Sequence, residues 1–134
     1  MKTQAAVLVE LQQPLQIVEL DIPPLTCGQV LVRILCSGIC GSQLGEIDGV
    51  KGHDAYLPHL LGHEGCGEVL EVGEGVRRVK PGERVVMHWR KAPGIEAATA
   101  QYGSALGKIN SGWVVTLARH AVVSENRLTP VPAD

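Results

Sequence analysis

The sequence predicts a mainly β domain, and three observations support that class. Short apolar runs alternate with glycine and proline, as in strands joined by turns, and the chain contains 16 glycines and 8 prolines. Phenylalanine is absent and aromatic residues make up only 3% of the chain, so Val, Leu and Ile must build the core. The length of 134 residues suits one domain with a real core.

The expected elements follow from these runs in chain order. Strands are predicted over residues 4–10, 15–21, 29–37, 67–72, 84–88 and 120–123. The run 30–35 is too continuously apolar for a half-solvated edge, so its strand is predicted to be central. A short helix is predicted over 42–48, with Ser42 or Gly41 near its N-terminal cap and Gly49 at its end.

The stretch 90–112 has no clear apolar periodicity and is rich in Ala, Gly and Ser. It is predicted to be a long surface excursion. Two interpretations stay open for it: a mobile loop, or a lid or oligomer contact.

Composition excludes several classes of partner. The net charge is −2 and no basic stripe is present, which argues against nucleic acid. No apolar run is long enough to span a membrane. Four cysteines without a signal peptide indicate reduced thiols and a cytoplasmic protein.

Two glycine-framed motifs carry the candidate chemistry. Cys40 lies in Gly-Ile-Cys-Gly-Ser, residues 38–42, and His63 lies in Gly-His-Glu-Gly-Cys-Gly, residues 62–67. A catalytic zinc takes three protein ligands from Cys, His and carboxylate groups and leaves one position open. Cys40 and His63 are therefore predicted zinc ligands, and Glu64 is the available carboxylate. A thiol at a helix start also gains from the helix dipole, which lowers its pKa.

The remaining cysteines and histidines are given structural interpretations. Three cysteines are expected to be small apolar packing residues: Cys27, Cys36 and Cys66. Four histidines lack a glycine frame and are not predicted to be ligands: His53, His59, His88 and His120.

The second motif continues through residues 68–76 with glycine at positions 73 and 75. This spacing resembles the zinc-containing alcohol dehydrogenases of the medium-chain dehydrogenase/reductase family, and the similarity covers nearly the whole chain. It implies a GroES-like distorted β-barrel with a few short helices, with residues 1–134 as the catalytic domain of a larger α/β enzyme. No Gly-x-Gly-x-x-Gly motif follows a strand, so a Rossmann cofactor domain is expected after residue 134.

The resemblance also implies an activity and roles for single residues. One catalytic zinc would polarise the oxygen of an alcohol, aldehyde or ketone while hydride passes to or from NAD or NADP. Ser42 matches the hydroxyl residue that takes the alcohol proton, and Glu64 matches a carboxylate close to the metal. The third strong ligand would come later in the chain. Trp89 matches a substrate-pocket position, although a partly buried core aromatic is an equal alternative.

Three departures from the family pattern limit the resemblance. Gln43 stands where an acidic residue is usual, and Gly45 stands where some members have a relay histidine. No cysteine follows Cys66, so the structural zinc site of many members is expected to be absent.

Two alternatives to the zinc dehydrogenase stay open: a zinc-free quinone or enoyl reductase domain, and a stand-alone, non-catalytic β-barrel interaction module. On the first hypothesis the partner is a small alcohol or carbonyl compound, and the full-length enzyme is expected to form a homo-oligomer. The isolated chain is expected to be inactive as a dehydrogenase and to bind zinc weakly or with a substitute ligand such as water.

Overall fold

The computed structural model describes residues 1–133. The described part of the chain is built mainly of strands, as predicted. Its elements are β1 (Lys2–Leu8), β2 (Gln16–Asp21), β3 (Gln29–Ser37), α1 (Gly41–Asp48), β4 (His59–Leu60), β5 (Glu64–Val72), β6 (Arg84–His88), β7 (Gln101–Tyr102), β8 (Ile109–Asn110), β9 (His120–Ser124), the 3-10 helix η1 (Glu125–Arg127) and β10 (Leu128–Pro130).

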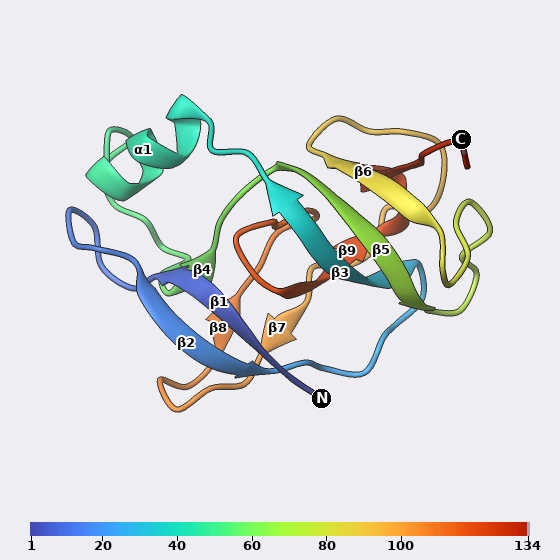
Figure 1. Ribbon diagram of the computed structural model, residues 1–134. Helices are drawn as coiled ribbons and strands as arrows, with labels where there is room; N and C mark the ends of the chain where they lie inside the picture. The colour runs from blue at the N-terminus through green and yellow to red at the C-terminus, as the bar shows by residue number, and fades with distance from the viewer. Residues whose placement is uncertain (134) are drawn as a thin grey trace.

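The strands form two five-stranded sheets (Figure 1). One has the order β2-β1-β4-β8-β7 and the other the order β10-β6-β5-β3-β9. Because β3 pairs with β5 on one side and β9 on the other, the prediction that 30–35 lie in a central strand is confirmed. The helix α1 follows β3 and lies at one end of the two sheets (Figure 1).

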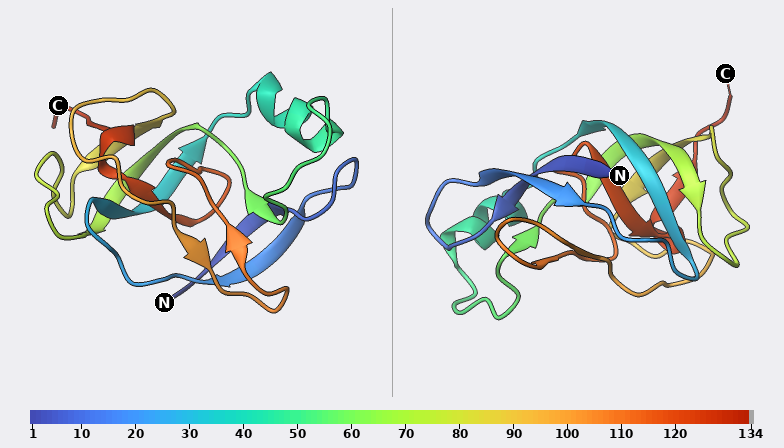
Figure 2. Two further views of the ribbon diagram at one scale, coloured as in Figure 1. Left: turned by 180° about the vertical axis from the view of Figure 1, so that it is seen from behind. Right: turned by 90° about the horizontal axis from the view of Figure 1, so that it is seen from below.

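The segment 117–119 joins the two sheets. The Leu117 carbonyl accepts a hydrogen bond from Ala6 of β1 at 2.9 Å, and the Arg119 carbonyl accepts one from Ile34 of β3 at 2.9 Å. Figure 2 shows the two sheets curving around a shared interior. The result is the barrel-like arrangement that the sequence predicted.

Aliphatic side chains fill the interior, as the composition required. Val7, Val30 and Val69 have no exposed surface. Tyr102 is the large aromatic exception, since it is 1% exposed and its hydroxyl accepts a hydrogen bond from the Val122 N–H at 2.7 Å. Burial raises the pKa of Tyr102 to about 12.

Several predicted boundaries are corrected by the structure. The first strand covers Lys2–Leu8 rather than 4–10, because the chain then enters a turn in which Gln12 has a φ of 61°. The fifth strand begins at Glu64 rather than at 67, since Glu64 already pairs with His88. The cap of α1 is Cys40, not Ser42 or Gly41, whereas Gly49 ends the helix with a φ of 71°, as predicted.

The prediction that 90–112 form a surface excursion is wrong in part, since Tyr102 and Ile109 are buried. Its second half contains the antiparallel pair β7–β8, and β8 also pairs in parallel with β4 through His59 and Asn110. Each of these strands has two residues, too few to show an apolar period.

Cys27 and Cys36 are exposed, so the prediction that they are packing residues is wrong for both. Cys36 lies near the end of β3, beyond the buried part of that strand, whereas Cys66 is half-buried. Within residues 1–133, no helix has the length and apolar character needed to cross a membrane.

Candidate functional site

The glycines of the two motifs allow the chain to approach itself closely. Gly62 has a φ of 99°, and a Cβ atom there would overlap with Thr116 Oγ1. A Cβ atom on Gly38 would lie 2.8 Å from Glu64 Oε1. Only glycine fits at Gly62 without strain, and His63 follows it directly.

Cys40 joins the end of β3 to the start of α1 and is half-buried. Its thiol pKa is lowered, first by a hydrogen bond from the Ser42 hydroxyl and then by the Ser42 backbone N–H. The negative charge of Glu64 acts in the opposite direction. The position at a helix start and the direction of the pKa shift agree with the sequence prediction, but the main cause is the Ser42 hydroxyl rather than the helix dipole; both features favour the thiolate that a metal requires.

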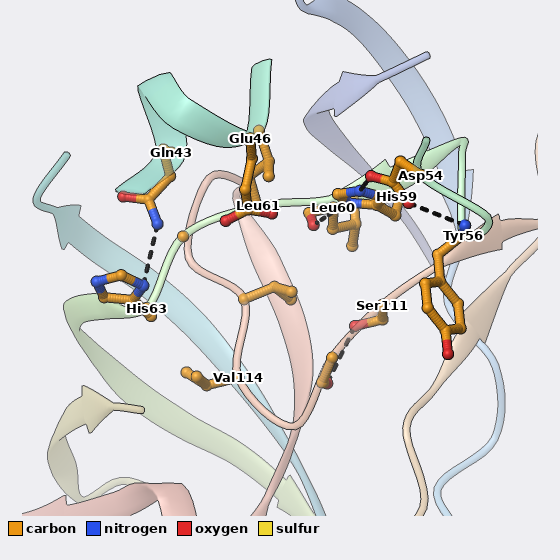
Figure 3. Close-up of a pocket in the computed structure, with 13 residues that line it drawn as sticks. Gln43, Glu46, Asp54, Tyr56, His59, Leu60, Leu61, His63, Ser111 and Val114 are labelled. Atoms are coloured by element: carbon orange, nitrogen blue, oxygen red, sulfur yellow. Dashed lines mark hydrogen bonds and ion pairs between the residues drawn. The ribbon is translucent and has the colours of Figure 1, made fainter. Parts of the chain in front are cut away.

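Gln43 joins the predicted site residues to one another. Its side chain is buried, and its Oε1 accepts a hydrogen bond from the Cys40 N–H at 2.8 Å. Its Nε2 lies 3.0 Å from His63 Nδ1, as Figure 3 shows, and 3.3 Å from Ser42 Oγ. The sequence marked Gln43 only as a departure from the family pattern and did not predict that it bridges Cys40, Ser42 and His63.

The donor types at this point suit a zinc ion. Cys40 offers a thiol of lowered pKa, and one ring nitrogen of His63 is hydrogen-bonded to Gln43, so the other ring nitrogen is left for a metal. Within residues 1–133, no group of three His, Cys, Asp or Glu side chains is placed to hold a metal. Cys40 and His63 therefore fit as part of a ligand set, and ligation by the exposed Glu64 stays a prediction.

A cavity of about 330 Å³ opens beside His63 and Gln43. Asp54 and His59 lie on its wall, with His59 Nε2 2.7 Å from Asp54 Oδ2 and His59 Nδ1 2.9 Å from the Leu60 carbonyl oxygen (Figure 3). Both ring nitrogens of His59 are thus occupied within the protein, in keeping with the expectation that it is not a ligand.

A second, largely apolar cavity of about 720 Å³ lies beyond Val114, which lines both. Trp89 and Trp113 line it, and they are 61% and 46% exposed. The alternative interpretation of Trp89 as a partly buried core aromatic is therefore wrong. Glu64 of β5 pairs with His88 of β6, and Trp89 is the residue after His88. Trp89 therefore follows the point at which β6 lies beside the motif that contains His63.

Arg127 contacts both tryptophans, the ring of Trp113 and the backbone of Trp89. Its guanidinium lies over the Trp113 ring at 4.8 Å from the centroid, and its Nη1 donates a hydrogen bond to the Trp89 carbonyl. Its Nη2 forms an ion pair with the Glu96 carboxylate at 2.7 Å. One side chain from η1 thereby connects the cavity wall to the loop that follows Trp89.

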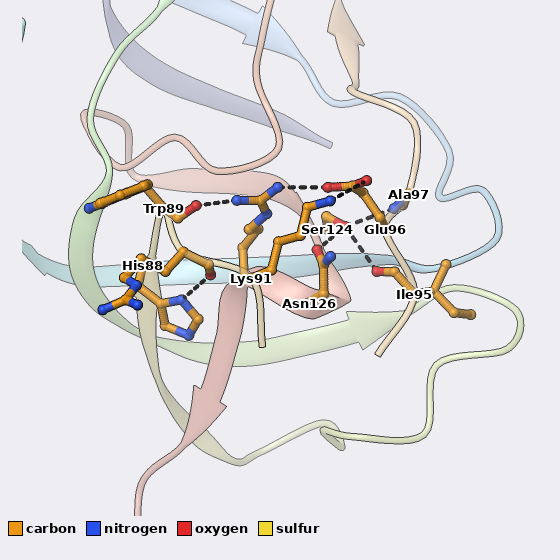
Figure 4. Close-up of polar contacts among 10 residues, drawn as sticks. His88, Trp89, Lys91, Ile95, Glu96, Ala97, Ser124 and Asn126 are labelled. Carbon is orange, nitrogen blue, oxygen red and sulfur yellow. Dashed lines mark hydrogen bonds and ion pairs between the residues drawn. The ribbon is translucent and has the colours of Figure 1, made fainter. Parts of the chain in front are cut away.

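The loop after β6 is ordered by hydrogen bonds to residues 124–127 (Figure 4). The Ser124 hydroxyl accepts from the Ala97 N–H at 2.7 Å and donates to the Ile95 carbonyl at 3.0 Å. The Glu125 carboxylate accepts from the Ile95 N–H at 2.8 Å. These contacts hold the loop against residues 124–127.

A family model described as the alcohol dehydrogenase GroES-like domain matches residues 26–133. The chain belongs to this family. It is 43% identical over 86 residues to the S-(hydroxymethyl)glutathione dehydrogenase of Escherichia coli O1:K1, and 45% identical over 86 residues to that of a Synechocystis strain. In each case the match covers 64% of this chain and 23% of the relative, so the chain spans about a quarter of the length of these curated relatives.

Solved structures of dehydrogenases share the fold of this GroES-like domain. An alcohol dehydrogenase zinc-binding domain protein from Burkholderia ambifaria matches with a TM-score of 0.86 and 23% identity, over 100% of this chain and 43% of that one. The alcohol dehydrogenase from Aeropyrum pernix matches with a TM-score of 0.70 and 28% identity, over 98% of this chain and 40% of that one. The GroES-like fold prediction is confirmed.

Proposed function

We propose that this GroES-like domain is the metal-binding catalytic part of a zinc-dependent dehydrogenase. The enzyme would transfer hydride between an alcohol, or the corresponding aldehyde or ketone, and NAD or NADP. The observation that carries the proposal is that two donors of the kind that zinc takes, Cys40 with its lowered thiol pKa and His63, lie together at one buried side chain, that of Gln43. The relatives named above, all dehydrogenases, support the reaction class.

Different residues of the chain would have different roles in the reaction. Cys40 and His63 would hold the zinc, which supplies a positive charge that polarises the substrate oxygen. Ser42 Oγ lies at the exposed start of α1, where it would take the proton of an alcohol. Trp89 and Trp113 would bound an apolar cavity for the rest of the substrate.

Metal binding by single variants tests this assignment. Cobalt(II) should give the 134-residue chain a thiolate-to-metal absorption band, and Cys40→Ser should abolish it because the thiolate donor is lost. Cys36→Ser, an exposed thiol four residues earlier, is the matched control and should keep the band. An unchanged band in Cys40→Ser, or no band in any variant, would exclude this metal site.

Turnover separates the enzyme proposal from its alternatives. We expect the 134-residue chain to show no alcohol oxidation with NAD or NADP, because its sequence contains no dinucleotide-binding motif. Turnover by this chain alone would contradict that expectation. If the wild-type chain binds no metal and Cys40→Ser gives the same cobalt spectrum as the wild type, the zinc-free reductase or the interaction module would be favoured instead.

A further inference from the structure

The direction of the Gln43 amide is fixed by its neighbours. A backbone N–H can only donate, so the Gln43 atom that faces the Cys40 N–H at 2.8 Å is the carbonyl oxygen. The amide NH₂ group therefore faces the other way, toward His63 Nδ1 at 3.0 Å and Ser42 Oγ at 3.3 Å. The Gln43 side chain is 1% exposed, so little solvent competes for these contacts.

We propose that Gln43 is a positioning residue that holds His63, in the metal-free chain, as the tautomer with its proton on Nε2. A neutral imidazole has one donor and one acceptor nitrogen. Since Gln43 donates to Nδ1, that nitrogen is the acceptor and Nε2 carries the hydrogen. Figure 3 shows Nε2 on the side of the ring away from Gln43, where it is the nitrogen left for a metal.

This tautomer opposes metal binding. A ligating histidine needs a lone pair on the coordinating nitrogen and donates its other N–H to an acceptor. If Nε2 binds the zinc of the proposed function, on which this inference rests, the proton must sit on Nδ1 and face Gln43. The amide must then turn over, and its NH₂ group meets the Cys40 N–H, so the hydrogen bond at that end is lost.

A glutamate at position 43 removes the conflict. One carboxylate oxygen can accept from the Cys40 N–H while the other accepts from His63 Nδ1–H. Glutamate is a standard residue at this position of a capping box, and a negative charge is favoured in the first turn of a helix, so Gln43→Glu is expected to fold. Partners of metal ligands change metal affinity by about 10 to 100-fold, and we expect Gln43→Glu to tighten zinc binding by roughly that factor.

Zinc affinity is measured by competition with a chromophoric chelator. The wild-type chain, Gln43→Glu and the control Gln4→Glu, which makes the same change at an exposed position of β1, are compared. Tighter binding by Gln43→Glu alone is the expected result. Equal affinity of all three chains overturns the role of Gln43 and leaves the zinc site standing, whereas no zinc binding by any chain overturns the proposed metal centre itself.

The tautomer is measured directly, without any variant, by long-range ¹H–¹⁵N correlation spectra of the metal-free wild-type chain at a pH at which His63 is neutral. The inference requires a protonated Nε2 and an unprotonated Nδ1. The opposite pattern overturns it whatever the zinc affinities. In Gln43→Glu the pattern should invert, since a carboxylate at position 43 accepts from Nδ1.

Discussion

At the scale of single residues, Gly62 lies directly before His63 and allows a close contact with Thr116. Its φ of 99° is unfavourable for any other residue, and its missing side chain leaves room for Thr116 Oγ1. Gly107 has a similar φ of 91°, but a Cβ atom added there would have no neighbour within 4 Å. A comparison of substitutions at Gly62 and Gly107 therefore separates the energetic cost of backbone strain from that of steric overlap.

We expect Gly62→Ala to destabilise the chain by about 3 kcal/mol or more, because strain and overlap with Thr116 add. Gly107→Ala should cost only about 1 to 2 kcal/mol, from strain alone. Urea unfolding followed by far-ultraviolet circular dichroism measures both values. Equal losses would show that the contact with Thr116 relaxes freely.

Ser42 gives a prediction on pH dependence. Its hydroxyl is the main cause of the lowered Cys40 pKa, so Ser42→Ala should raise that pKa toward its ordinary value. Less thiolate is then present at neutral pH, and alkylation of Cys40 by iodoacetamide should slow. Peptide-resolved mass spectrometry of the metal-free chain across pH measures the rate. The exposed Cys36 is the internal control, and a profile of Cys40 that does not move would contradict the prediction.

The candidate site was predictable only in part. Cys40 and His63 stand out because glycines frame them in a recognisable spacing. The position of Gln43 three residues after a helix cap is a capping-box signal, but Cys40 is an unusual cap residue. The contact between Gln43 and His63 joins residues 20 apart, and no local pattern in the sequence encodes it.

At the scale of elements, the strands that were predicted are those whose apolar runs are long enough to show a pattern. The boundaries of β3 and β6 agree with the prediction, because both strands have continuous apolar runs with turn residues at their ends. In contrast, β4, β7 and β8 contain two residues each: β4 pairs with the distant strands β1 and β8, and β7 pairs with β8 across a short loop. Such strands follow from the assembled sheet and not from their own sequence.

The short helix η1 gives an element-scale prediction. Burial alone would raise the pKa of Glu125, but the N–H groups of Ile95, Arg77 and Arg78 together outweigh it and lower that pKa. Replacing the carboxylate leaves these donors with a weaker acceptor, so Glu125→Gln should destabilise the chain by about 1 to 3 kcal/mol at neutral pH. Glu71→Gln, at an exposed position of β5, is the control and should have little effect.

The same variant has a defined pH dependence. A carboxyl whose pKa is lower in the folded than in the unfolded chain stabilises the fold above its unfolded pKa, and this contribution is lost as pH falls through the folded pKa. The stability difference between wild type and Glu125→Gln should therefore shrink on acidification. Urea midpoints of both chains, measured from neutral pH to below the ordinary glutamate pKa of 4.5, test this expectation. A stability difference that does not change with pH would contradict the assigned cause.

At the scale of the whole molecule, the two sheets are expected to unfold as one unit. They share one aliphatic core, and residues 117–119 hydrogen-bond to β1 of one sheet and to β3 of the other. A chain of this size with a single core usually unfolds in one cooperative step.

The only tryptophans, Trp89 and Trp113, both line the apolar cavity, so fluorescence reports that region, whereas far-ultraviolet circular dichroism reports all strands. Coincident urea transitions by the two probes are expected; a fluorescence transition at lower urea would show that the cavity wall and its loop unfold before the barrel.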